Sequence, residues 1–103
     1  MILLTLASFA LQTAPVAGSA EEAAYCSWVL YHAEQNSVGT VRDGYRAHID
    51  SWSARLSERT ADAADAAAAA NSAVTTALSL AEDLVGGSEE GIQAQRQWCL
   101  DNA

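Results

Sequence analysis

The two cysteines constrain the fold of this chain more than any other feature of its sequence. Cys26 and Cys99 lie at opposite ends of the region that follows residue 20, and an even cysteine count in an exported protein favours a disulfide. Their separation is too large for the CxxC motif of a redox site or for a haem-attachment motif. We therefore expect Cys26 and Cys99 to pair, which requires their Cα atoms to lie within roughly 7 Å.

Residues 1–20 have the pattern of a secretory signal peptide. They contain no charged side chain, and the apolar run of residues 2–11 is followed by small residues, so that cleavage after Gly18 or Ala20 is possible. The Lys or Arg that usually precedes such a run is absent. The basic residues are all Arg and Ala is frequent, as in GC-rich bacteria. We predict export to the bacterial periplasm or secretion.

An uncleaved inner-membrane anchor is the main alternative for this segment, and a buried helix is the other. A membrane-spanning helix needs about 20 mostly apolar residues. The continuous apolar run here is about half that length, and Gln12, Pro15 and Gly18 interrupt the remainder of the segment. We therefore expect the mature domain, residues 21–103, not to be embedded in the membrane.

Residues 21–103 are predicted to form a single α-helical domain. Ser19 and Glu22 make a capping box that opens a helix over residues 21–35, whose apolar residues cover most of its circumference. Gly39 suits the left-handed position after that helix. Ser88 is the expected N-cap of a last helix that ends near residue 100. No window shows the alternation of a β-strand.

Between these helices, apolar residues or Ala recur at steps of three and four from residue 41 to residue 84. This spacing predicts one helix face. The pattern is interrupted only at Arg59 and Thr60. The residues that define the face are Val41, Tyr45, Ile49, Trp52, Leu56, Ala63, Ala66, Ala70, Val74, Ala77, Ala81 and Leu84.

An unbroken middle helix and an internal disulfide exclude each other. If the flanking helices fold back along a straight middle helix, Cys26 and Cys99 lie about 37 Å apart along its axis. A chain reversal near residues 62–63 would bring them to the same height, with Thr60 as an acceptable N-cap for the new helix. We therefore predict a small antiparallel bundle of about four helices, closed by one disulfide.

The alternative is a long central helix with two short flanking helices, in an antiparallel homodimer whose disulfides join Cys26 of one chain to Cys99 of the other. The Ala-rich stretch of residues 61–77 suits close helix packing in either arrangement. The aromatic half of the chain should supply the better core. Its members are Tyr25, Trp28, Tyr31, Tyr45 and Trp52. The protein is thus expected to be a monomer or an antiparallel homodimer.

The charge balance excludes several classes of partner. With 13 acidic residues against 5 Arg, the net charge is −8, which argues against nucleic-acid binding and against docking on anionic lipid. Most acidic pairs lie near expected helix N-termini, where negative charge is stabilising. The acidic and Arg side chains of residues 42–50 and 55–62 are expected to pair on the helix surface at i, i+4 spacing.

No motif indicates catalysis or a cofactor. His32 and His48 lack further ligands at metal-binding spacing, and nucleotide-binding, nucleophile-elbow and zinc-protease motifs are absent. We expect no enzyme activity, no metal and no cofactor.

The leading hypothesis is a small exported, acidic, non-catalytic helical protein that binds an unknown protein partner or serves structural packing in the periplasm. A second hypothesis is a membrane-tethered coiled coil with intermolecular disulfides. An N-terminal apolar segment, a helical rod and a C-terminal Trp98-Cys99 give it a layout that resembles phage inner-membrane spanin subunits, without a diagnostic motif. A third is a small-ligand binder with a pocket between the aromatic helices.

Overall fold

The computed structural model describes residues 15–103, which form four helices: α2 (Ala20–Gln35), α3 (Gly39–Thr60), α4 (Ala66–Val85) and α5 (Glu89–Asp101). The prediction of a small all-α bundle closed by one disulfide is confirmed, and no strand occurs in these residues. Most of the signal peptide predicted for residues 1–20 lies outside the described residues, so it stays a prediction. None of the described helices is both long and apolar enough to cross a membrane.

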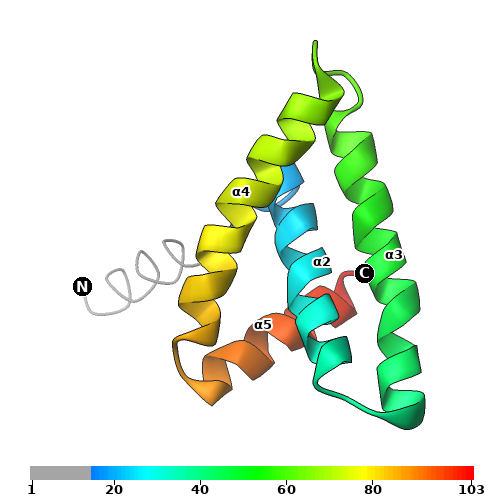
Figure 1. The fold of residues 1–103 in the computed structure, drawn as a ribbon, viewed down its shortest axis with the longest axis vertical. Helices are drawn as coiled ribbons and strands as arrows, with labels where there is room; N and C mark the ends of the chain where they lie inside the picture. Colours follow the sequence, from blue (N-terminus) through cyan, green and yellow to red (C-terminus); the bar gives the residue numbers. More distant parts are fainter. Residues whose placement is uncertain (1–14) are drawn as a thin grey trace.

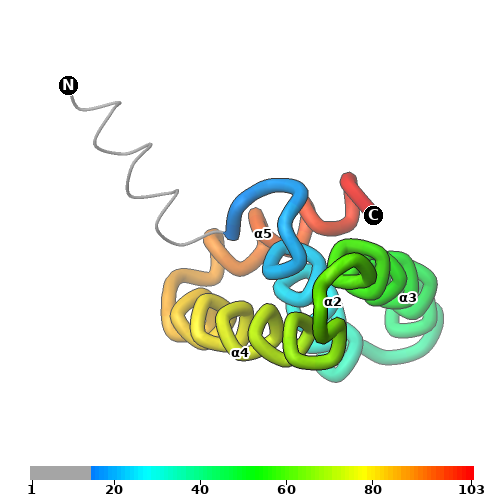
Figure 2. Tube along the Cα trace, turned by 90° about the horizontal axis from the view of Figure 1, so that it is seen from above, coloured from blue at the N-terminus to red at the C-terminus, as the bar shows by residue number. Residues whose placement is uncertain are grey.

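The helices α3 and α4 form two sides of a triangle that meet at the connection of residues 61–65, and α5 crosses obliquely from the lower end of α4 toward the middle of α3 (Figure 1). Seen from above, α2 lies between α3 and α4, with α5 behind it (Figure 2). The central helix α2 packs against all three of the others. This arrangement leaves α3 and α4 well separated toward the base of the triangle (Figure 1).

The central position of α2 follows from its apolar circumference. An amphipathic helix buries one face, whereas a helix that is apolar on most sides must be covered from several directions. The buried side chains of α2 accordingly occupy several sides of the helix: Glu22, Ala23, Ala24, Tyr25, Cys26, Val29, Leu30, Ala33 and Glu34.

The helix ends are capped largely as the sequence predicts. The Oγ of Ser19 accepts from the Glu22 N–H at 3.1 Å, while the Glu22 carboxylate accepts from the Gly18 N–H, one residue earlier than in a standard capping box. The Oγ of Ser88 accepts from the Gly91 N–H at 3.1 Å. Gly39 has φ +62°, the left-handed conformation expected of it.

The chain reverses over residues 61–65, next to the predicted midpoint, so the alternative with one long central helix is wrong. The predicted N-cap is also wrong: Thr60 is the last residue of α3, and its hydroxyl donates to the Leu56 carbonyl at 2.9 Å. Asp65 caps α4 instead, with a carboxylate oxygen 3.0 Å from the Ala68 nitrogen. The intervening residues allow the chain to turn before the new helix begins.

The buried face of α4 consists of Ala73, Ala77 and Ala81, at successive intervals of four. Side chains this small let α4 approach α2 closely. Val74, which we expected on the buried face, instead remains 38% exposed at its edge. The Ala stripe thus brings α4 against α2 and leaves a larger apolar side chain at the margin of the contact.

Candidate functional site

The disulfide joins α2 to α5 within one chain. Cys26 and Cys99 are fully buried, with their Cα atoms 5.4 Å apart. No cysteine of the chain is free. The structure therefore contains an intramolecular disulfide in place of the intermolecular disulfides of the coiled-coil alternative.

Trp52 of α3 completes the junction around the disulfide. Its buried indole N–H donates to the Cys99 carbonyl at 2.8 Å, and its ring stacks with that of Trp98 at a centroid distance of 6.1 Å. The Arg55 guanidinium lies over the Trp52 ring at 4.4 Å and donates to the Asn102 carbonyl. The helices α2, α3 and α5 thus meet at a buried structural disulfide. It offers no exposed thiol, which cysteine chemistry requires.

Tyr25 is the one buried side chain in this region whose polar atom has no partner. Its hydroxyl forms no hydrogen bond with any described residue, and the side chain is almost completely buried. Burial raises the pKa of Tyr25 from 10.0 to about 12, because the phenolate would lose its hydration.

Two carboxylates of α2 are buried and each is paired with an arginine of α3. Arg59 donates to Glu22 at 3.1 Å and to the Ser19 carbonyl at 2.8 Å, and Arg46 donates to Glu34. The predicted i, i+4 surface pairing is therefore wrong for Arg46 and Arg59. Their partners lie on another helix, because the carboxylates buried at both ends of α2 need compensating charge.

The two histidines lie on different helices, His32 on α2 and His48 on α3. The His32 ring stacks on Trp28 with centroids 5.2 Å apart. Within residues 15–103, no group of three or more His, Cys, Asp or Glu side chains is placed to hold a metal ion.

An open groove of about 290 Å³, here called the apolar groove, lies between α2, α3 and α4. Its lining is almost entirely apolar, and three of the large side chains remain substantially exposed: Tyr31, Val74 and Leu78. Its lining residues are Ala24, Ser27, Trp28, Tyr31, Ile49, Ser53, Leu56, Val74, Ala77 and Leu78. Trp28 is partly buried and packs against the core, whereas the expectation that Tyr31 belongs to the core is wrong, because its side chain is 47% exposed at this groove.

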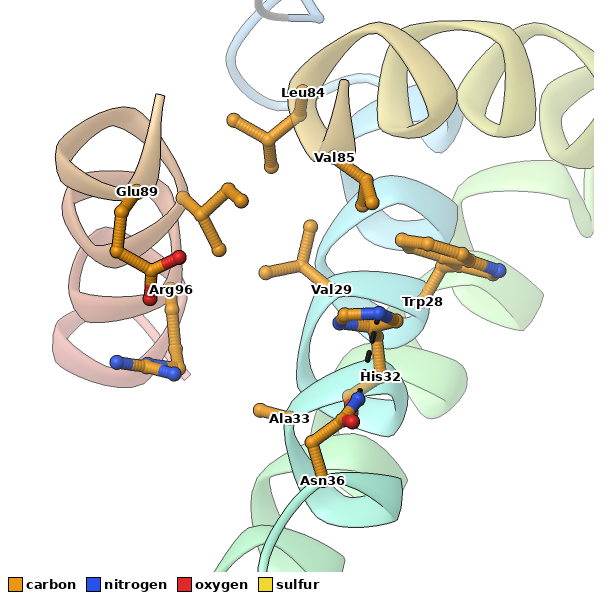
Figure 3. A pocket seen from close by; sticks show the side chains of 10 residues that line it. Trp28, Val29, His32, Ala33, Asn36, Leu84, Val85, Glu89 and Arg96 are labelled. Carbon is orange, nitrogen blue, oxygen red and sulfur yellow. Dashed lines mark hydrogen bonds between the residues drawn. The ribbon is translucent and has the colours of Figure 1, made fainter. Parts of the chain in front are cut away.

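A second cavity of about 280 Å³, here called the charged pocket, lies between α2, the end of α4 and α5. Figure 3 shows Glu89 and Arg96 on α5 and His32 and Asn36 on α2, on opposite sides of the cavity. No protein family, curated protein or solved structure matches this chain. The candidate sites therefore rest on their geometry alone.

The charged pocket was not predicted from the sequence. Glu89 fits a capping role at the start of a helix, and Arg96 has no neighbour at helical spacing that singles it out. The available signal was that Glu89, Ile92 and Arg96 share one helix face at intervals of three and four. The residues that this face of α5 meets on α2 and α4 depend on how α5 packs, and the sequence pattern does not predict that packing.

Proposed function

We propose that this chain is a small exported, non-catalytic protein that binds a basic amphipathic helix of a protein partner in the apolar groove. The observation that carries the proposal is a continuous apolar surface on a chain of net charge −8. Clustered exposed apolar side chains on a soluble domain typically mark an interaction site.

Export to the periplasm, or secretion, is supported by the pattern of residues 1–20 and by the buried disulfide. Stable disulfides form in oxidising compartments, and small exported domains depend on them. Intact-mass measurement of protein recovered from the periplasmic fraction tests this part. Cleavage after Gly18 or Ala20 is expected, whereas a membrane-bound chain that retains residues 1–20 would show the inner-membrane anchor instead.

A helix is the occupant that the groove fits best. Three helices line it and leave Val74 and Leu78 exposed on α4 opposite Tyr31 of α2. An amphipathic helix binds such a surface through apolar anchors at i, i+3, i+4 and i+7. The volume, about 290 Å³, suits a few anchoring side chains better than a large ligand.

The charge of the protein favours a basic polar face on this helix. Glu82 lies one turn beyond Leu78 on α4, and Asp62 and Asp65 lie in the connection between α3 and α4. Among the arginines, Arg46 and Arg59 are already neutralised by α2 carboxylates. A second copy of this chain would carry the same charge of −8 and would be repelled.

A synthetic peptide with Leu at helical anchor positions and Lys elsewhere is a suitable probe. Val74→Asp places a charge in the groove and should weaken binding of this peptide by about tenfold or more in calorimetric titration, because an apolar anchor would then lie against a carboxylate. Val41→Asp is the matched control, since Val41 is 62% exposed and does not line the groove.

The two variants separate groove binding from simple charge attraction. If the peptide were held only by the acidic surface, the extra carboxylate of Val74→Asp would strengthen binding as much as that of Val41→Asp. Equal affinities for the two variants would therefore overturn the proposal. Self-association of the wild-type chain through this face, abolished by Val74→Asp in sedimentation, would replace the partner helix with a second copy.

A further inference from the structure

The charged pocket is separate from the apolar groove, although Trp28 borders both. Its walls come from α2, from the last turn of α4 and from α5, and its volume is about 280 Å³. Val29, Leu84 and Ile92 give it an apolar interior. This volume is close to the lower limit, about 300 Å³, of pockets that hold small molecules.

Two opposite charges on α5 line this pocket without neutralising each other. Glu89 and Arg96 lie seven residues apart on one face of the helix, and neither forms an ion pair with any residue of 15–103. Of the four arginines of α3, Arg46 and Arg59 are paired with carboxylates, whereas Arg42 and Arg55, like Arg96, form no ion pair with any described residue. Arg96 is partly buried, whereas Glu89 is exposed at the rim of the pocket.

The opposite wall offers a flat aromatic surface and polar atoms. His32 stacks on Trp28, and the Asn36 side-chain nitrogen lies 3.4 Å from His32 Nε2 (Figure 3). The Asn36 amide also donates to the His32 carbonyl at 2.8 Å, which holds it in place. The pocket thus combines an apolar interior, one anion, one cation and fixed hydrogen-bonding groups.

We propose that the charged pocket binds a small zwitterion with an apolar body, whose carboxylate pairs with Arg96 and whose ammonium group pairs with Glu89. A simple organic anion would meet Glu89 in the pocket and a protein charge of −8 around it. A simple cation would meet Arg96. A neutral molecule with separated charges avoids both penalties and satisfies both side chains.

The spacing of the charges favours an apolar dipeptide over a free amino acid. Seven residues of helix place the Cα atoms of Glu89 and Arg96 about 10 Å apart along the axis. A dipeptide in extended form separates its charged ends by about 7 Å, and the two long side chains close the remaining distance. A free apolar amino acid carries the same ammonium and carboxylate groups, but they lie closer together. It is therefore less able than a dipeptide to reach Glu89 and Arg96 at the same time.

The experiment that distinguishes them is calorimetric titration of the disulfide-bonded exported protein with leucyl-leucine and, separately, with leucine. We expect leucyl-leucine to bind more tightly, and its N-acetylated and C-amidated forms each to bind about tenfold more weakly or worse. Arg96→Gln should lose the preference for a free carboxylate, and Glu89→Gln the preference for a free ammonium group. Arg42→Gln and Glu90→Gln are matched controls that remove the same charges outside the pocket.

The outcomes separate the possibilities. Tighter binding of leucine than of leucyl-leucine assigns the pocket to free amino acids and keeps the zwitterion. The proposal is overturned if neither leucine nor leucyl-leucine binds at about millimolar concentration, or if the blocked dipeptides bind as tightly as leucyl-leucine. It is also overturned if Arg42→Gln and Arg96→Gln change the affinity for leucyl-leucine equally. Val74→Asp should leave dipeptide binding unchanged, so this result does not depend on the function proposed for the apolar groove.

Discussion

At the scale of single residues, Tyr25 shows how burial without a partner affects stability. Its pKa is raised from 10.0 to about 12, so the folded state favours the protonated phenol more than the unfolded state does. The stability that comes from protonated Tyr25 is fully present below pH 10 and is lost as the pH rises toward 12. We expect the free energy of unfolding to fall over that interval, measured by denaturant titration at each pH.

Tyr25→Phe should remove this pH-dependent loss and leave the protein as stable as the wild type, or more stable by up to about 1 kcal/mol, at neutral pH. The reason is that the hydroxyl has no hydrogen-bond partner among the described residues, so its removal relieves a desolvation cost. Tyr31→Phe is the control, because that side chain is 47% exposed. A marked loss of stability in Tyr25→Phe would show that the hydroxyl has a partner after all.

Residue-level prediction from the sequence succeeded where the chemistry is local. The caps formed by Ser19 and Ser88 depend on residues three positions away, and the local pattern shows them. The pairing of Arg59 with Glu22 joins residues on two different helices. No local spacing shows such a pair, and the sequence offered closer carboxylates that fit equally well.

At the scale of the helices, the Ala stripe of α4 determines how closely α4 and α2 pack. Ala81 is fully buried, so Ala81→Leu should force the helices apart and destabilise the protein by about 1–3 kcal/mol. Ala68→Leu, on the exposed first turn of the same helix, should change stability by less than about 0.5 kcal/mol. Chemical denaturation measures both, and equal effects would show that the contact tolerates larger side chains.

Helix-level prediction located the chain reversal from the disulfide requirement and the interruption at Arg59 and Thr60. It did not identify Asp65 as the cap, because several residues of that connection can cap a helix. It also placed Val74 on the buried face, since helical spacing cannot separate neighbouring positions of an Ala-rich helix. The apolar groove and the charged pocket both arise from these packing details.

At the scale of the whole molecule, the triangular arrangement depends on a few long-range connections. The sides α3 and α4 meet at residues 61–65, while α5, which crosses between them, is held by its disulfide to α2 and by the hydrogen bond from Trp52 to the Cys99 carbonyl (Figure 1). Both candidate sites include side chains of α2, which is tied to each of the other helices. The sites should therefore be lost together when the bundle opens.

The disulfide is the connection whose loss tests this view most directly. It spans 73 positions of sequence, and a closed loop of that length restricts the unfolded chain enough to stabilise the fold by about 4 kcal/mol. The double substitution Cys26→Ser and Cys99→Ser should lower the melting temperature strongly without exposing a lone thiol, and should weaken dipeptide and helical-peptide binding together. Thermal denaturation followed by circular dichroism measures the first effect and calorimetry the second. An unchanged melting temperature would mean that helix packing alone maintains the triangle, whereas loss of binding at only one site would mean that the two sites belong to independently stable parts.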